Sequence, residues 1–185
     1  MIEFSADRIN RAIAALSHIP GAAPQAIANA INRASETART EAARKVRESY
    51  YIKHGDVIGT INIKKATPSD LAAAVISKGG PSPLMKFKVT PSAPQPRRRT
   101  PIIVRVKRGG GGTIRRAFVA QMQSGHIDVF NRVGQSRLPI IERYGPSIPQ
   151  MLGSPTVTQW VREKAGEKLE ERLNHEITRI LEAQR

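Results

Sequence analysis

The sequence predicts an α+β fold in which helices at both ends of the chain flank a mostly antiparallel sheet. Near both ends, apolar residues recur every three or four positions, as on the buried face of a helix; in the middle they alternate in short runs, as in strands. A basic segment rich in proline and glycine interrupts the strands. We expect a single domain over residues 1–185, with N-terminal helices in 1–51, the sheet in 58–145 with a basic loop at 90–112, and the C-terminal helix in 155–185.

The N-terminal region predicts two helices. Ser5 can cap a short first helix, which Pro20 and the following glycine end. A second, longer helix is expected to begin at Pro24 and to extend to Tyr50. Its apolar side is rich in alanine, which permits a close approach by another backbone. The partner is either the chain's own sheet, another helix or a neighbouring subunit.

The centre of the chain predicts several strands joined by turns. A hairpin is expected from residues 60–64 and 71–76, and a second hairpin turns at Ser124-Gly125. Further strand candidates are residues 84–89, 102–107, 114–122 and 126–133. The prolines in residues 90–101 remove backbone donors, so this stretch is predicted to be an exposed loop. The four glycines 109–112 predict a flexible tip between two basic strands.

The C-terminal helix carries an unusual apolar stripe. From Val157 to Leu181 its apolar residues follow one another at intervals of four, so the stripe drifts by about 40° per step around the helix. One end must therefore bury a different face from the other. Either this helix contacts its own domain at one end and another subunit at the other, or it is buried on several sides. On the first interpretation, the expected subunit-interface residues are Leu169, Leu173, Ile177 and Leu181.

Positive charge is concentrated in one segment. Between Lys86 and Arg116 there are ten basic residues and no acidic one, so two thirds of the formal net charge of +15 lies in about one sixth of the chain. Such a run is either screened by solvent or bound by a polyanion or an acidic protein face. Few aromatic residues lie near it, so any DNA contact is expected to be to the backbone, without sequence preference. The candidate contact residues are Arg97, Arg98, Arg99, Arg105, Lys107, Arg108, Arg115 and Arg116.

The residues give no support for an enzyme, a metal site or a cofactor. The four histidines are scattered, and only His126 has a carboxylate nearby on the same strand face, in Asp128, without a third ligand. The glycine run matches no phosphate-binding fingerprint, and no serine lies in a nucleophile elbow. The chain has no cysteine, which excludes disulfides and thiolate ligands. It lacks a long apolar run and a signal-like start, so neither a membrane span nor secretion through a cleaved signal is expected.

The segment RRAFVAQMQSGHIDVFNRVGQSRLPI, from Arg115 to Ile140, and the following Tyr144-to-Pro149 stretch resemble the family of phage minor tail protein Z, the tail completion proteins of long-tailed phages. The resemblance implies a structural virion protein, without enzymatic activity, at the head-proximal end of the tail. Its implied partners are the tail terminator and head-tail connector proteins, and its implied role is joining the tail to a DNA-filled head. Sixfold tail symmetry implies a hexameric ring, assembled in the host cytoplasm.

Two other functions remain open on the residues alone. The first is a nonspecific DNA-binding protein from another setting, which would show salt-dependent affinity and form no ring. The second is a capsid or head-tail connector component, which differs only in its location in the particle. The neighbouring genes would distinguish the tail protein from these two alternatives, because a position between a head-tail connector gene and a tail terminator or tube gene favours the tail protein.

Overall fold

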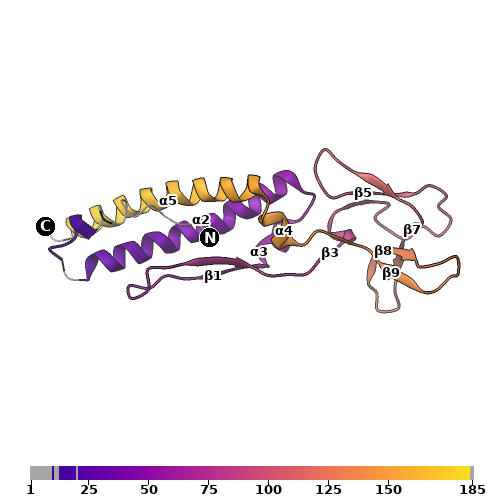
Figure 1. The fold of residues 1–185 in the computed structure, drawn as a ribbon, viewed down its shortest axis with the longest axis horizontal. Helices are drawn as coiled ribbons and strands as arrows, with labels where there is room; N and C mark the ends of the chain where they lie inside the picture. Colours follow the sequence, from indigo (N-terminus) through magenta and orange to yellow (C-terminus); the bar gives the residue numbers. More distant parts are fainter. Residues whose placement is uncertain (1–9, 11–12, 20, 184–185) are drawn as a thin grey trace. The chain divides into compact units, whose positions relative to one another are not determined.

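The computed structural model describes residues 10, 13–19 and 21–183, and it confirms the α+β fold (Figure 1). The expected N-cap at Ser5 and the helix end at Pro20 lie outside these residues. The chain divides into two compact units, each described by itself below; a single domain over the whole chain stays a prediction. Unit 1 comprises Met1–Ala43, Ile61–Ser77 and Gly153–Arg185, and unit 2 comprises Arg44–Thr60 and Lys78–Leu152.

Unit 1 is built from long helices and one hairpin. Helix α2, Ala22–Ser49, contributes most of its length to this unit, and helix α5, Pro155–Glu182, begins with proline in its first turn as expected. Strands β1, Ile61–Lys64, and β2, Ala74–Ser77, form the predicted antiparallel hairpin. Asn32 of α2 holds the chain after β1, because its side-chain amide both donates to and accepts from the backbone of Ala66, at 2.9 and 2.8 Å.

The core of unit 1 lies between α2 and α5. Leu169 and Leu173, 0% and 3% exposed, pack with Ile27, Ile31 and the small residues Ala28, Ala30 and Ala34 of α2. The alanine-rich side of α2 is therefore covered by α5 of the same chain and by Ala66 beside the β1–β2 hairpin, rather than by a sheet alone.

This packing corrects the expected subunit interface. Leu169 and Leu173 are buried inside their own chain, and Ile177 packs partly buried against the same cluster. The apolar positions from Val157 to Leu173 are all buried, although they turn by about 160° around the helix axis. Helix α5 is thus enclosed on several sides by its own chain over this length, and only Leu181, 38% exposed, is left open among the four.

Unit 2 consists of short strands in small antiparallel sheets. One sheet has the order β4-β5-β6, a second has β7-β8-β9, and β10 pairs with β3. The strands are β3 Ser82–Pro83, β4 Lys88–Thr90, β5 Ile102–Arg105, β6 Gly112–Ile114, β7 Ala117–Gln121, β8 Ile127–Arg132, β9 Ile140–Glu142 and β10 Tyr144–Gly145. The short helices are α3 His54–Ile58, the 3-10 helix η1 Leu84–Lys86, and α4 Ile148–Leu152.

Several predicted strands change at their ends. The strand expected over residues 114–122 is broken by a turn at Arg115-Arg116, where Arg116 adopts a left-handed backbone with φ of 58°. The strand expected over 84–89 begins as η1 instead. The hairpin around Gly125 is confirmed by the pairing of β7 with β8. No helix in the described part of the chain combines the length and apolar character that crossing a bilayer requires.

Candidate functional site

Nearly all of the net positive charge belongs to unit 2. This unit carries 18 basic and 4 acidic side chains, a formal net charge of +14, whereas unit 1 carries 12 basic and 11 acidic ones, a net of +1. Charge at this density on a small unit repels itself unless counterions or an anionic partner offset it.

The four acidic side chains of unit 2 are already engaged within the unit. Glu48 pairs with Lys45, Asp56 with Lys86 and Glu142 with His126, while Asp128 is buried in the interior. Over residues 44–60 and 78–152, the structure therefore places no acid against the basic side chains of β4 and β5.

The pairing of β4, β5 and β6 creates a basic sheet face. The register pairs Lys88 with Arg105 and Ile103 with Thr113. Because side chains alternate along a strand, these residues share one face, while Val104 and its neighbours on the other face are buried. Two cations thus lie side by side on the open face of this sheet.

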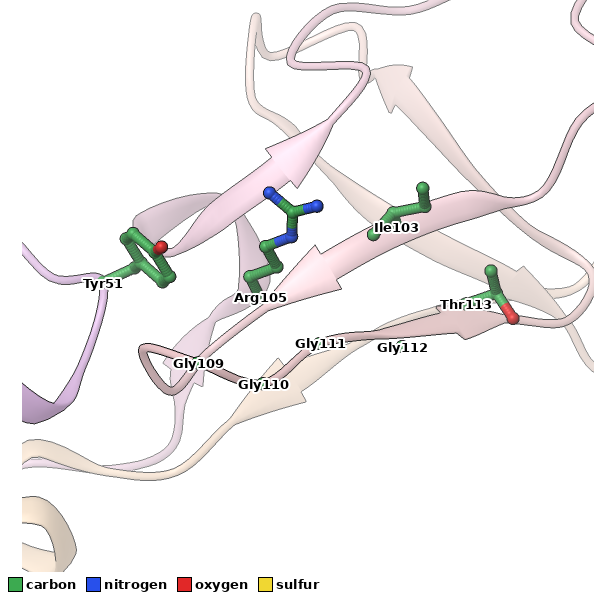
Figure 2. Close-up of a pocket in the computed structure, with 8 residues that line it drawn as sticks. All are labelled: Tyr51, Ile103, Arg105, Gly109, Gly110, Gly111, Gly112 and Thr113. Carbon is green, nitrogen blue, oxygen red and sulfur yellow. The ribbon is translucent and has the colours of Figure 1, made fainter.

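Two tyrosines border this face. The ring centroid of Tyr51 lies 5.5 Å from Lys88 Nζ and 4.8 Å from Arg108 Cζ, and the ring centroid of Tyr50 lies 5.9 Å from Lys107 Nζ. A pocket of about 590 Å³ opens here, and Figure 2 shows its lining: Tyr51, Ile103, Arg105, Thr113 and the glycines 109–112. The basic sheet face is defined here as Tyr50, Tyr51, Lys88, Arg105, Lys107 and Arg108.

The tyrosines could not be recognised from the sequence as part of this site. They precede the basic run by more than thirty residues, and they reach it only because Tyr50 pairs with Lys107 and Tyr51 N donates to Val106 O. Lys88 lies inside the basic run, but only the strand register shows that it stands beside Arg105.

Two of the predicted contact residues also have structural roles. Arg108 Nε donates to Arg47 O, and its backbone amide to Ser49 O, both at 2.8 Å. These carbonyls belong to the last turn of α2, where they have no partner within the helix and where a cation is favourable. Arg98 folds the loop on itself, because its guanidinium donates to Thr100 O at 2.9 Å and to Pro101 O at 3.1 Å.

The other predicted contact residues are exposed at separate places. Arg97 and Arg99 lie on the loop between β4 and β5, and Arg115 and Arg116 form the turn between β6 and β7. The structure thus gathers Arg105, Lys107 and Arg108 at the tyrosines and keeps the arginines of the two turns outside that group.

The chemistry available at this face is electrostatic. Guanidinium and ammonium groups can bind the phosphate oxygens of a nucleic-acid backbone or the carboxylates of a protein, and such contacts do not depend on the partner's sequence. Phe87 is 7% exposed, and Phe118 is half-buried beneath the Arg132 guanidinium at 5.5 Å, so neither ring is open for base stacking. Reading of a nucleic-acid sequence therefore has little support in this part of the structure.

Comparison with known proteins gives one match. The family described as "Prophage minor tail protein Z (GPZ)" matches residues 8–184, almost the full length of the chain. Neither the curated proteins nor the solved structures contain a match. The chain therefore belongs to the prophage minor tail protein Z family and is a structural protein of the phage tail, located in the virion.

Proposed function

We propose that this protein completes the tail at its head-proximal end and helps to join it to the head. In this proposal the basic sheet face of unit 2 and the exposed loop arginines Arg97 and Arg99 contact the backbone of the genomic DNA. The observation that carries the proposal is the net charge of +14 on unit 2, whose own acids are all engaged elsewhere. A protein at the head-tail junction meets the end of the genome, which is a polyanion and so has a charge opposite to that of unit 2.

A ring of identical subunits is the second part of the proposal, with the tail terminator and the head-tail connector as neighbours. Large apolar side chains remain exposed for such contacts: Leu181 is 38% exposed, while Val133, Leu138 and Ile141 around the end of β8 and β9 are 62%, 66% and 47% exposed. Analytical ultracentrifugation and particle reconstruction test this part. A single copy per tail would contradict it.

The DNA contact predicts a measurable salt dependence. If about six phosphates are neutralised, the logarithm of the duplex-binding constant falls against the logarithm of salt concentration with a slope of about −5. Arg97→Ala/Arg99→Ala should flatten the slope by about two units, equally for unrelated sequences. Arg98 is left intact, because its side chain holds the loop. The matched control is Lys65→Ala/Arg162→Ala, which removes the same charge from unit 1 and should leave the slope unchanged.

The same variants separate DNA from an acidic protein partner. If Arg97→Ala/Arg99→Ala keeps the slope but loses affinity for purified tail terminator or connector protein, then an acidic protein face replaces DNA in the proposal. In complementation of a phage that lacks this gene, the variant should yield tails that assemble but join heads poorly. Normal yields of joined particles would contradict a role of these arginines in joining.

A further inference from the structure

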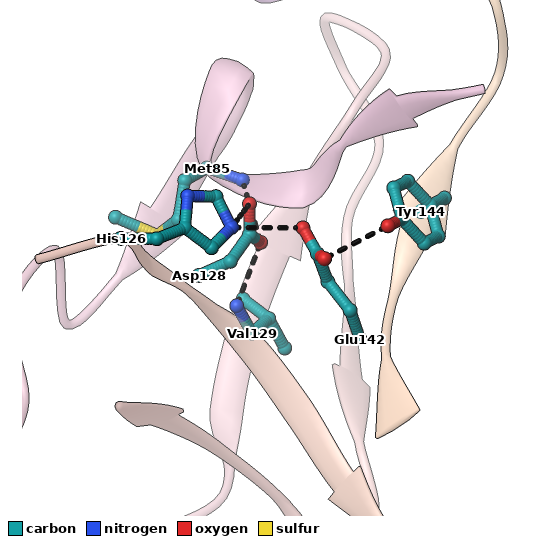
Figure 3. Close-up of polar contacts among 6 residues, drawn as sticks. All are labelled: Met85, His126, Asp128, Val129, Glu142 and Tyr144. Atoms are coloured by element: carbon teal, nitrogen blue, oxygen red, sulfur yellow. Dashed lines mark hydrogen bonds and ion pairs between the residues drawn. The ribbon is translucent and has the colours of Figure 1, made fainter. Parts of the chain in front are cut away.

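Three ionisable side chains meet in unit 2 beside the paired strands β8 and β9, which belong to a different sheet from β4 and β5 (Figure 3). His126 Nε2 lies 3.1 Å from Glu142 Oε1 and 3.9 Å from Asp128 Oδ2. Glu142 pairs with Phe130, two positions after Asp128, so both carboxylates lie on the same face of the sheet. The sequence supplies the first two residues at close spacing, and the third only through the register of β9.

Asp128 is the unusual member of this cluster. Its side chain is 1% exposed, and Oδ1 accepts hydrogen bonds from the backbone amides of Val129 at 2.6 Å and Met85 at 3.3 Å. Oδ2 has no hydrogen-bond partner among the described residues and faces the imidazole of His126. A buried carboxylate oxygen without a partner is costly, and a cation at this position would satisfy it.

We propose that His126, Asp128 and Glu142 bind a divalent transition-metal ion, for which Zn²⁺ fits the donor set best. One imidazole nitrogen and two carboxylate oxygens are ligands that Zn²⁺ accepts, whereas Mg²⁺ and Ca²⁺ prefer oxygen ligands alone. One donor atom from each residue lies within 4.8 Å of the others.

The distances suit such an ion. Ligands at about 2.1 Å from a metal lie roughly 3.0 to 3.5 Å apart for octahedral or tetrahedral angles. The His126–Glu142 separation of 3.1 Å already falls in this range, and the His126–Asp128 separation of 3.9 Å exceeds it by about half an ångström. The His126 side chain is 46% exposed, which gives the ion a route from solvent and leaves room for water as a further ligand.

Surrounding groups hold the ligands in place. Tyr144 Oη donates to Glu142 Oε2 at 2.8 Å, which leaves Oε1 directed at His126. The two amides on Asp128 Oδ1 direct the opposite oxygen toward the imidazole. Such supporting hydrogen bonds are typical of metal sites. The ion would join the start of β8 to the end of β9 and, through the Met85 amide, to η1, so its role is to stabilise unit 2.

The alternative is that the cluster takes up no ion, and the three side chains then make only the contacts given above. The chain has no cysteine, so thiolates cannot account for Zn²⁺ binding.

Calorimetric titration of the full-length chain, stripped with EDTA, tests the proposal with Zn²⁺, Mn²⁺ and Mg²⁺ added separately. We expect saturable binding of one Zn²⁺ per chain, weaker binding of Mn²⁺ and no binding of Mg²⁺. His126→Gln and Glu142→Gln should each weaken Zn²⁺ binding at least about tenfold, because each removes a ligand. The matched control is His54→Gln, an exposed histidine of unit 2 outside the cluster.

A second measurement guards against variants that misfold. Zn²⁺ should raise the unfolding temperature of the wild type and of His54→Gln, but not that of His126→Gln, whose exposed side chain can be replaced without disturbing the core. The proposal is overturned if no saturable Zn²⁺ binding is found, or if a folded His126→Gln binds Zn²⁺ as tightly as the wild type does.

Discussion

Replacing Leu169 with alanine separates an intramolecular core from a subunit contact. Leu169 is 0% exposed and packs against the α2 side chains Ile27, Ile31 and Ala34. If this packing holds in the isolated chain, Leu169→Ala lowers the free energy of unfolding of the monomer itself. If the side chain instead belonged to a subunit interface, the monomer would lose little stability and only assembly would fail.

The magnitude follows from what the substitution removes. Losing the outer carbons of the leucine side chain costs about 2.4 kcal/mol of burial at about 0.8 kcal/mol per carbon. The cavity left behind adds roughly 1 kcal/mol or more, because the facing alanines are too short to fill it. The total of about 3 to 4 kcal/mol corresponds to a fall in the unfolding temperature of roughly 10 °C for a chain of this size.

Urea unfolding followed by circular dichroism measures the effect, at protein concentrations that differ at least about tenfold. The control is Leu181→Ala, on the same helix and 38% exposed, which should cost less than about 1 kcal/mol. A Leu169→Ala monomer as stable as the control, together with a loss of self-association, would refute the assignment of this residue to the chain's own core. So would a loss of stability that disappears at low protein concentration.

Two further predictions concern single contacts. Gly145→Ala should destabilise unit 2 by about 1 to 3 kcal/mol, because the new Cβ would lie 2.6 Å from Cε2 of the buried Phe87 ring. The control is Gly134→Ala, where a new Cβ meets no atom within 4 Å, and it should leave the free energy of unfolding from urea titration nearly unchanged. If both variants lose the same stability, the clash with Phe87 is contradicted. Burial opposes ionisation of Glu176, but hydrogen bonds from Arg179 and from an asparagine of α2 outweigh it and lower its pKa from 4.5. The ionised Glu176 carboxylate therefore adds to the free energy of unfolding above pH 4.5, and this contribution is lost as the pH falls through the lowered pKa. The difference in free energy of unfolding between the wild type and Glu176→Gln should shrink in acid. A difference that stays constant with pH would contradict this.

The long helices could be predicted from the sequence because their signals are local. The proline of the first turn and the apolar stripe of α5 lie within the helix itself, and the expected start at Pro155 is where α5 begins. The stripe indicated that α5 is buried along a turning surface. It could not indicate what covers that surface, since an alanine-rich helix of the same chain and a neighbouring subunit leave the same pattern.

The strands and the site depended on register, which local patterns do not contain. Strand β9 is three residues long and was not expected, yet it brings Glu142 to His126. The basic run located most of the candidate contact residues, but its charge gave no sign that Arg98 holds a loop, or that Arg108 closes the end of a helix. Both roles depend on backbone carbonyls, which carry no sequence signal.

The division of charge between the units has a consequence for the isolated protein. Unit 1 neutralises its own charge with nearly equal numbers of acids and bases, whereas unit 2 must draw its counterions from outside the chain. Outside a virion, unit 2 will take them from whatever polyanion is present, so purified material is expected to retain host nucleic acid until it is washed at high ionic strength. In the isolated chain, unit 1 is therefore nearly neutral, whereas the charge of unit 2 is offset only when an anionic partner binds it.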